Sequence, residues 1–171
     1  MERFVQGEAE GFDVLFTRHA GAVRRYVARM VGPAAADDLT QTTFLSLVRA
    51  RGRYRAGSPF KPWLFAIATN AARDHLRRRR PEDLTADGAP PKDVPAETGP
   101  QQDPGLERQV RAALDQLPAP QREAILLHRF EGLSFAEIAQ SVGVTESAVK
   151  VRAHRGYLRL RELLQALRGE A

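Results

Sequence analysis

The sequence contains no cysteine, which excludes disulfide scaffolds, thiolate zinc sites and cysteine nucleophiles. No two of its four histidines stand at helical ligand spacing, so a metal site would need carboxylates gathered from distant segments. No apolar run approaches the roughly 20 residues of a membrane span, and the N-terminal stretch MERFVQGEAEGF holds acids in place of the apolar core of a signal segment. We therefore expect a cytoplasmic protein with no membrane insertion, no metal and no cofactor.

Basic residues outnumber acidic residues, and the charges are unevenly distributed along the chain. The net charge of +5 divides into +8 for residues 1–80, −5 for residues 81–105 and +2 for residues 106–171. A basic excess often belongs to an ordinary solvated surface, and its alternative is a polyanionic partner such as nucleic acid. Both interpretations stay open on charge alone.

Residues 81–105 separate two segments of different composition. This stretch, PEDLTADGAPPKDVPAETGPQQDPG, is rich in proline and acids and has almost no large apolar residue, so it predicts a flexible linker. Neither flanking segment shows the alternation or the turn dipeptides of β-strands. The predicted fold is all-α, with two small helical domains joined by the linker.

The first segment predicts three helices. An apolar stripe at helical spacing marks the first, which Gly32 and Pro33 end; its members are Phe12, Leu15, Phe16, His19, Val23, Tyr26, Val27 and Met30. The second is expected over about 34–48 and the third over about 62–80, with the basic connection RARGRYRAGSPF between them. Trp63 shares core spacing with Leu64 and Ile67.

The second segment predicts a helix over about 106–117, another over about 121–130, and then a pair with a tight turn. Ser134 followed by Glu137 is a capping box that begins a helix at Phe135, and Gly143 ends that helix after two turns. A much longer helix follows. Two such helices form a helix-turn-helix, a motif that is typical of DNA-binding proteins.

The outward positions of the longer helix combine hydroxyls, an imidazole and cations, the mixture that reads base edges and phosphates in a major groove. The polar outer face of an ordinary bundle helix is the alternative. The predicted DNA-reading residues are Thr145, Ser147, Lys150, Arg152, His154 and Arg155.

The second segment resembles region 4 of bacterial sigma factors, the promoter-specificity subunits of RNA polymerase. The motifs LPAPQREAILLHRFEGLSFAEIAQSVGVTESAVKVRAHRGYLRLRELL carry this resemblance. The first segment is similar to region 2 of the extracytoplasmic-function (ECF) group, through ADDLTQTTFLSL and KPWLFAIATNAARDHLRRRR. The resemblance implies region 2 at 1–80, a linker at 81–105, and region 4, which reads the minus-thirty-five element, at 106–171.

The resemblance also implies roles for two groups in region 2. The core polymerase-binding surface would contain Asp38, Leu39, Gln41 and Phe44, although Ala35 and Thr42 replace acids that the family often carries. Recognition and melting of the minus-ten element would use Trp63, Asn70, Arg73 and Arg77. The implied partners are promoter DNA, core RNA polymerase through its β′ clamp helices and β flap, and an anti-sigma factor.

Two other functions compete with an ECF sigma factor. The first is a transcriptional regulator that uses the helix-turn-helix alone, with the first segment as a dimerisation or sensing module. The second is an enzyme in which Asp37 and Asp38 support metal-dependent phosphoryl chemistry. Adjacent carboxylates on a helix point about 100° apart, which argues against a shared metal site. We therefore expect no catalytic residues.

Overall fold

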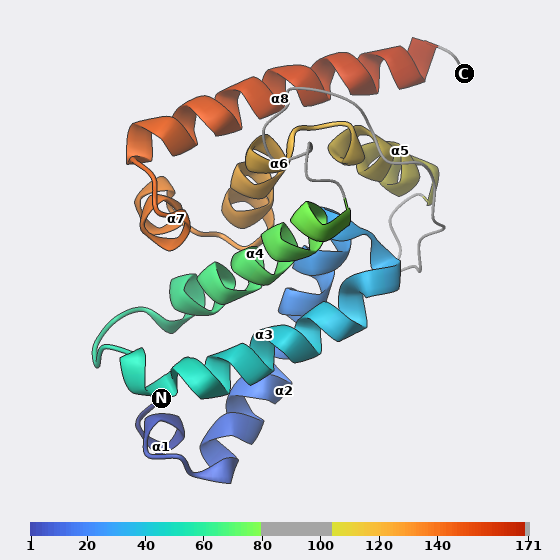
Figure 1. Cartoon of the computed structure of the whole chain (residues 1–171). Helices are drawn as coiled ribbons and strands as arrows, with labels where there is room; N and C mark the ends of the chain where they lie inside the picture. Colours follow the sequence, from blue (N-terminus) through green and yellow to red (C-terminus); the bar gives the residue numbers. More distant parts are fainter. Residues whose placement is uncertain (80–103, 170–171) are drawn as a thin grey trace.

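The computed structural model describes residues 1–79 and 104–169 (Figure 1). Within these ranges every regular element is a helix and none is a strand, which confirms the all-α prediction. Residues 81–103 of the predicted linker lie outside the described residues, whereas residues 104 and 105 already belong to a helix. Among the described helices, none combines the length and the apolar character needed to cross a bilayer.

The first lobe, residues 1–79, contains four α-helices. They are α1 (Glu2–Val5), α2 (Ala9–Val31), α3 (Ala36–Ala50) and α4 (Phe60–Arg79), with 3₁₀ turns η1 (Pro33–Ala35) and η2 (Arg51–Arg53) beside α3. Gly32 ends α2 with a φ of 97°, a conformation that glycine adopts without strain. Helix α3 begins two residues later than predicted, because Pro33 opens a 3₁₀ turn first.

The core of the first lobe lies among α2, α3 and α4. The Tyr26 hydroxyl is 2.7 Å from Thr69 Oγ1, and the Tyr26 and Phe65 rings meet edge to face with centroids 5.4 Å apart. Burial raises the pKa of Tyr26 well above its usual value, so the phenol stays neutral and forms this hydrogen bond. The predicted stripe of α2 is confirmed with one exception, since Phe16 is partly exposed at the edge of the core.

The second lobe, residues 104–169, begins with α5 (Pro104–Asp115) and α6 (Ala119–Ile125). The predicted helix over 121–130 is interrupted, because Leu126–Phe130 forms a π-helical turn, η4. The chain then enters α7 (Phe135–Val142) and the long α8 (Glu146–Gly169).

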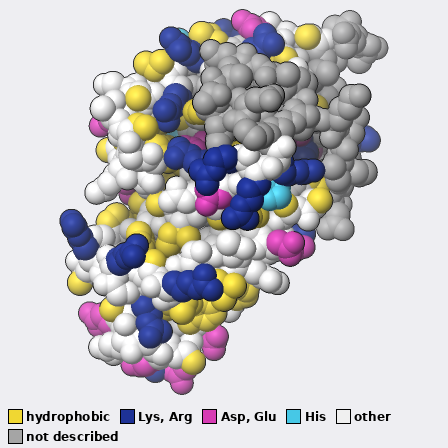
Figure 2. Space-filling model, in the orientation of Figure 1, with side chains coloured by type: hydrophobic (Ala, Val, Ile, Leu, Met, Phe, Trp, Pro, Cys, Tyr) yellow, Lys and Arg dark blue, Asp and Glu magenta, His cyan; other side chains and the backbone are white. Residues whose placement is uncertain are grey.

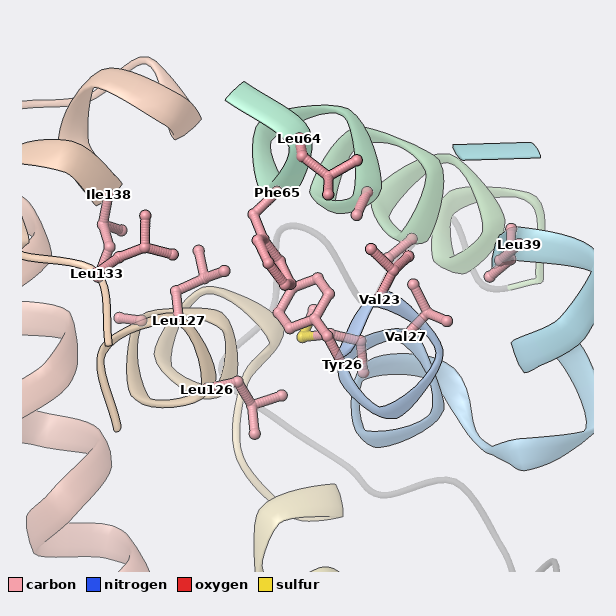
Figure 3. Packing of buried hydrophobic residues seen from close by; sticks show 14 of the residues in the cluster. Val23, Tyr26, Val27, Leu39, Leu64, Phe65, Leu126, Leu127, Leu133 and Ile138 are labelled. Carbon is pink, nitrogen blue, oxygen red and sulfur yellow. The ribbon is translucent and has the colours of Figure 1, made fainter. Parts of the chain in front are cut away.

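The two lobes pack directly against each other. Buried apolar residues form one cluster that runs from Val23 and Phe65 in the first lobe to Leu127 and Ile138 in the second (Figure 3). Helix α4 lies beside α6 and α7 in Figure 1, and Ser141 Oγ of α7 donates to the Pro62 carbonyl at 3.1 Å. The sequence predicted two lobes, but it did not predict this shared core.

Candidate nucleic-acid interface

The helix-turn-helix has the local geometry that its sequence predicts. The Ser134 Oγ accepts from the Glu137 amide at 3.2 Å, and Glu137 Oε2 accepts from the Ser134 amide at 2.8 Å, which completes the capping box. Gly143 ends α7 in the left-handed region, with φ 70° and ψ 39°. Thr145 Oγ1 then accepts from the Ala148 amide at 3.2 Å and caps α8.

The inner face of α8 is held by small and branched apolar residues. Val149 and Ala153 are buried, and Ala139 of α7 is buried where the two helices cross. A Cβ added to Gly156 would lie 2.8 Å from Ile125 Cδ1 and 3.3 Å from Gln121 Cβ, so α8 approaches α6 closely at this glycine. These contacts fix which face of α8 points outward.

Five of the six predicted DNA-reading residues lie exposed on α8 or at its start. They are Thr145, Ser147, Lys150, His154 and Arg155. Lys150 Nζ lies 2.7 Å from Glu146 Oε1, an exposed pair one turn apart that solvent and salt weaken. Arg152 differs, because it is half-buried and faces the side of α8 where it acts electrostatically on Glu123 of α6. The exposed face offers hydroxyls, an imidazole and cations to a groove.

Helix α4 carries the four residues predicted to contact the minus-ten element. Asn70 and Arg77 are exposed, whereas Trp63 is half-buried between the rings of Tyr54 and Phe60, with centroids 5.0 and 6.1 Å away. Trp63 therefore packs as part of an aromatic cluster. Arg73 is bound to Glu123 of the second lobe, through Nε at 2.9 Å and Nη2 at 2.8 Å.

The connection before α4 adds cations to this face. Arg51, Arg53 and Arg55 are exposed, and Tyr54 shapes the turn by donating its hydroxyl to the Ser58 carbonyl. Lys and Arg side chains predominate over acidic ones across the middle of the face in Figure 2. A face of this kind is suited to follow a nucleic-acid backbone.

Helix α3 carries the four residues predicted to bind polymerase, and they differ in their exposure to solvent. Asp38 and Gln41 are exposed on α3, but Leu39 and Phe44 are only 8% and 2% exposed. Leu39 and Phe44 therefore pack α3 against the rest of the first lobe, so two of the four predicted residues are exposed and two are buried. Leu45 of α3, which the sequence analysis did not single out, is 58% exposed.

Asp37, one of the two carboxylates on which the enzyme hypothesis depends, forms an ion pair with α2. Asp37 accepts from Arg24 Nε at 2.6 Å, and this hydrogen bond and the Arg24 charge lower the pKa of Asp37. No group of three metal-ligating side chains occurs among residues 1–79 and 104–169.

Sequence analysis also missed the residues that join the lobes. Glu123 and Glu131 are acidic and nearly buried, and each pairs with a cation of α4. Arg122 is likewise buried and donates from Nη1 to the Met30 carbonyl at 2.8 Å. The apolar run AILL beside Arg122 and Glu123 was the available signal, because charges next to such a run need partners when they are buried.

Comparisons with known proteins decide the family. Residues 15–82 match the model for Sigma-70 region 2, and residues 107–160 match the model for Sigma-70, region 4. The RNA polymerase sigma factor CarQ of Myxococcus xanthus is 48% identical over 169 residues, covering 98% of this chain and 97% of that protein. The ECF RNA polymerase sigma factor SigE of Mycolicibacterium smegmatis is 40% identical over 167 residues, covering 93% of this chain and 63% of that protein.

The chain belongs to the ECF group of RNA polymerase sigma factors. A solved structure agrees with the fold of this ECF sigma factor: the sigma factor RpoE in complex with the anti-sigma factor NepR from Bartonella quintana. Its TM-score is 0.79 at 28% identity, and the match covers 92% of this chain and 98% of that one. The family resemblance inferred from the motifs is thereby confirmed.

Proposed function

We propose that this ECF sigma factor binds core RNA polymerase, directs it to two-part promoters and promotes opening of the DNA for transcription initiation. The observation that carries this proposal is the presence, in one chain, of two dissimilar nucleic-acid faces. One is the exposed reading face of α8, and the other is the cationic face of α4 and the connection before it. A regulator that binds an operator through a helix-turn-helix needs only the first of these faces.

Each lobe has a separate role in the proposed function. Residues 1–80 would act as region 2, which binds core polymerase and recognises and melts the minus-ten element. Residues 106–171 would act as region 4, in which α8 reads the minus-thirty-five element through Ser147, Lys150, His154 and Arg155. Residues 81–105 would connect the two. Asn70, Arg73 and Arg77 would contact the minus-ten strand, while Trp63 would support them from its aromatic cluster.

Two protein partners belong to this proposal. Core RNA polymerase would bind region 2 through its β′ clamp helices, on a surface that includes Asp38, Gln41 and Leu45, and region 4 through its β flap. An anti-sigma factor is the second proposed partner, because the matched Bartonella sigma factor was solved in complex with one. The protein would act in the cytoplasm and catalyse no bond change of its own.

Dependence of DNA binding on polymerase tests this function. Fluorescence anisotropy of labelled DNA from upstream of the protein's own gene would be measured with the protein alone, with core polymerase alone and with both. A sigma factor predicts tight, sequence-dependent binding only when both are present. Tight binding by the protein alone would instead indicate the stand-alone regulator.

A matched pair of variants tests whether this surface of α3 binds core polymerase. Asp38→Ala removes an exposed charge from the proposed polymerase-binding face of α3, and Asp13→Ala removes an exposed charge from α2, outside that face. Asp38→Ala should weaken the binding of core polymerase several-fold, whereas Asp13→Ala should leave it unchanged. Equal effects of the two variants would refute the assignment of this face.

A further inference from the structure

We propose that Val151 is a specificity-determining residue of α8: it contacts the 5-methyl group of a thymine in the major groove and so selects thymine at one position of the minus-thirty-five element. This inference rests on the proposed function, because it assumes that α8 enters the groove. It deepens that function by assigning one base of the promoter to one side chain.

Val151 points directly away from the body of the second lobe. Successive residues of an α-helix are about 100° apart, so the buried Val149 and Ala153 each lie about 160° from Val151, on opposite sides of it. Helices α5, α6 and α7 all lie to one side of α8 in Figure 1. The Val151 side chain is accordingly 47% exposed, at the centre of the outward face of α8.

The predicted DNA-reading residues surround Val151. Ser147 and Arg155 lie one turn before and after it and about 40° to either side, whereas Lys150 lies about 100° away, at the margin of the face. A helix in the major groove brings the centre of its outer face closest to the base edges and its margins closest to the phosphates. Val151 therefore occupies the position on α8 that is best placed to contact a base.

The chemistry of valine limits which base this can be. Valine neither donates nor accepts a hydrogen bond, and the one apolar group that the four bases present in the major groove is the thymine 5-methyl. A valine placed against the amino group of adenine or cytosine would remove water from a donor without replacing its partner, which lowers affinity. Val151 therefore favours thymine both by attraction and by exclusion of other bases.

The fold gains little from a valine at this position. Val151 is exposed, and valine is a weaker helix former than alanine because its branched side chain loses rotamer freedom in a helix. The same stiffness holds the two methyl groups of Val151 in one arrangement, which favours a contact of fixed geometry. Val151→Ala should therefore leave the second lobe folded while it removes the proposed contact.

Selection of DNA by the polymerase complex tests which base is read. Duplexes from a random library would be selected for binding to this protein with core polymerase, and then sequenced. The unsubstituted protein should select thymine at one position that Val151→Ala no longer specifies, while the other preferences stay. The matched control is Val14→Ala, which removes the same two methyl groups from a 55% exposed valine of α2 and should leave every preference unchanged.

Two results of the selection would overturn the proposal. One is an identical set of preferences in Val151→Ala and in the unsubstituted protein. The other is loss, in Val151→Ala, of a preference for a base other than thymine. Circular dichroism would check that both variants stay folded.

Replacement of the selected thymine by uracil isolates the methyl group, because uracil keeps the pairing and the acceptor of thymine but lacks its methyl. Uracil should weaken binding by the unsubstituted protein and polymerase about threefold to fivefold, the effect of exposing one methyl group. Fluorescence anisotropy would measure this ratio. Val151→Ala should bind the two duplexes equally, and Val14→Ala should keep the full ratio. Absence of a methyl effect in the unsubstituted protein, or a methyl effect that survives in Val151→Ala, would overturn the proposal.

The proposed function fails separately from this inference. Failure of the unsubstituted protein to bind core polymerase would remove the sigma function, and the selection and the uracil comparison would then use the protein alone. A methyl effect that Val151→Ala removes would uphold the assignment of Val151 even in a stand-alone regulator. If neither form selected any DNA sequence, both proposals would be overturned.

Discussion

Gly156 of α8 lies against Ile125 of α6 so closely that a Cβ at Gly156 would be 2.8 Å from Ile125 Cδ1. The same Cβ would lie 3.3 Å from Gln121 Cβ and 3.4 Å from the Gln121 carbonyl oxygen, which belong to a packed helix. Ile125 is itself fully buried, so its methyl group has little room to move. This close approach sets the orientation of the proposed DNA-reading helix.

Gly156→Ala should therefore lower the free energy of unfolding by about 1–2 kcal/mol, because overpacking outweighs the gain in helix propensity. Gly21→Ala is the matched control, since Gly21 lies in helix α2 and an added Cβ there meets only the end of the Arg25 side chain at 3.4 Å. That control should gain up to about 1 kcal/mol. Urea denaturation would measure the free energy of unfolding of both variants. An increase in that free energy for Gly156→Ala would show that α8 can shift away from α6.

The buried hydrogen bond between Tyr26 and Thr69 should couple α2 to α4. Tyr26→Phe and Thr69→Val should each lower the free energy of unfolding by about 1–2 kcal/mol, because each leaves one buried hydroxyl without its partner. The double variant should cost clearly less than the sum of the two single costs. Strictly additive costs in the double-mutant cycle would argue against the bond.

Glu123 should make the stability depend on pH with a definite sign. Burial raises the pKa of Glu123 in the folded chain, so its contribution to stability is fully present below the unfolded pKa of about 4.3 and is lost as pH rises through the folded pKa. The stability difference between the protein and Glu123→Gln isolates this group, since glutamine does not titrate. That difference should fall from pH 4 toward neutral pH in urea denaturation.

A difference that instead grows with pH would mean that the charge of Arg73 outweighs burial and lowers the pKa of Glu123. It would also mean that the ionised Arg73–Glu123 pair stabilises the contact between the lobes. The measurement therefore bears on the contact between the lobes as well as on a single pKa.

Lys150 and Arg155 should affect DNA recognition with little effect on folding. Both side chains are exposed on α8, and the exposed pair of Lys150 with Glu146 contributes at most about 0.5 kcal/mol. Lys150→Ala or Arg155→Ala should weaken promoter binding by the polymerase complex. Each should also reduce the slope of log affinity against log salt concentration by roughly the contribution of one phosphate contact.

Arg159→Ala is the control for this pair, because Arg159 lies further along α8 in an exposed pair with Glu162. It should change neither promoter binding nor its salt dependence. A large loss of thermal stability in Lys150→Ala or Arg155→Ala would show that the DNA-reading face has been assigned wrongly.

The local features of the fold could be predicted because short-range rules determine them. The capping box at Ser134 and the left-handed Gly143 follow from their residue types, and the structure has both. The exposed face of α8 follows in the same way from the spacing of Val149 and Ala153, which are buried. The π-helical turn at Leu126–Phe130 has no comparable signal in the sequence.

Contacts between the lobes could not be predicted because they join residues far apart in the chain. The sequence could indicate that Glu123 needs a partner, but only the tertiary arrangement makes that partner Arg73. Helical spacing also failed to separate core from surface on α3, where Leu39 and Phe44 proved to be buried within a motif assigned to docking. Spacing identifies a helical face, but it does not identify what covers that face.

The most direct test of the central claim is in vitro run-off transcription. The purified protein is added to core RNA polymerase free of other sigma factors, on a template that carries the promoter region of the protein's own gene, with core polymerase alone as the control. The sigma function predicts a specific transcript that appears only when the protein is present. Absence of the transcript, together with no detectable binding of the protein to core polymerase in the same preparation, would contradict the account.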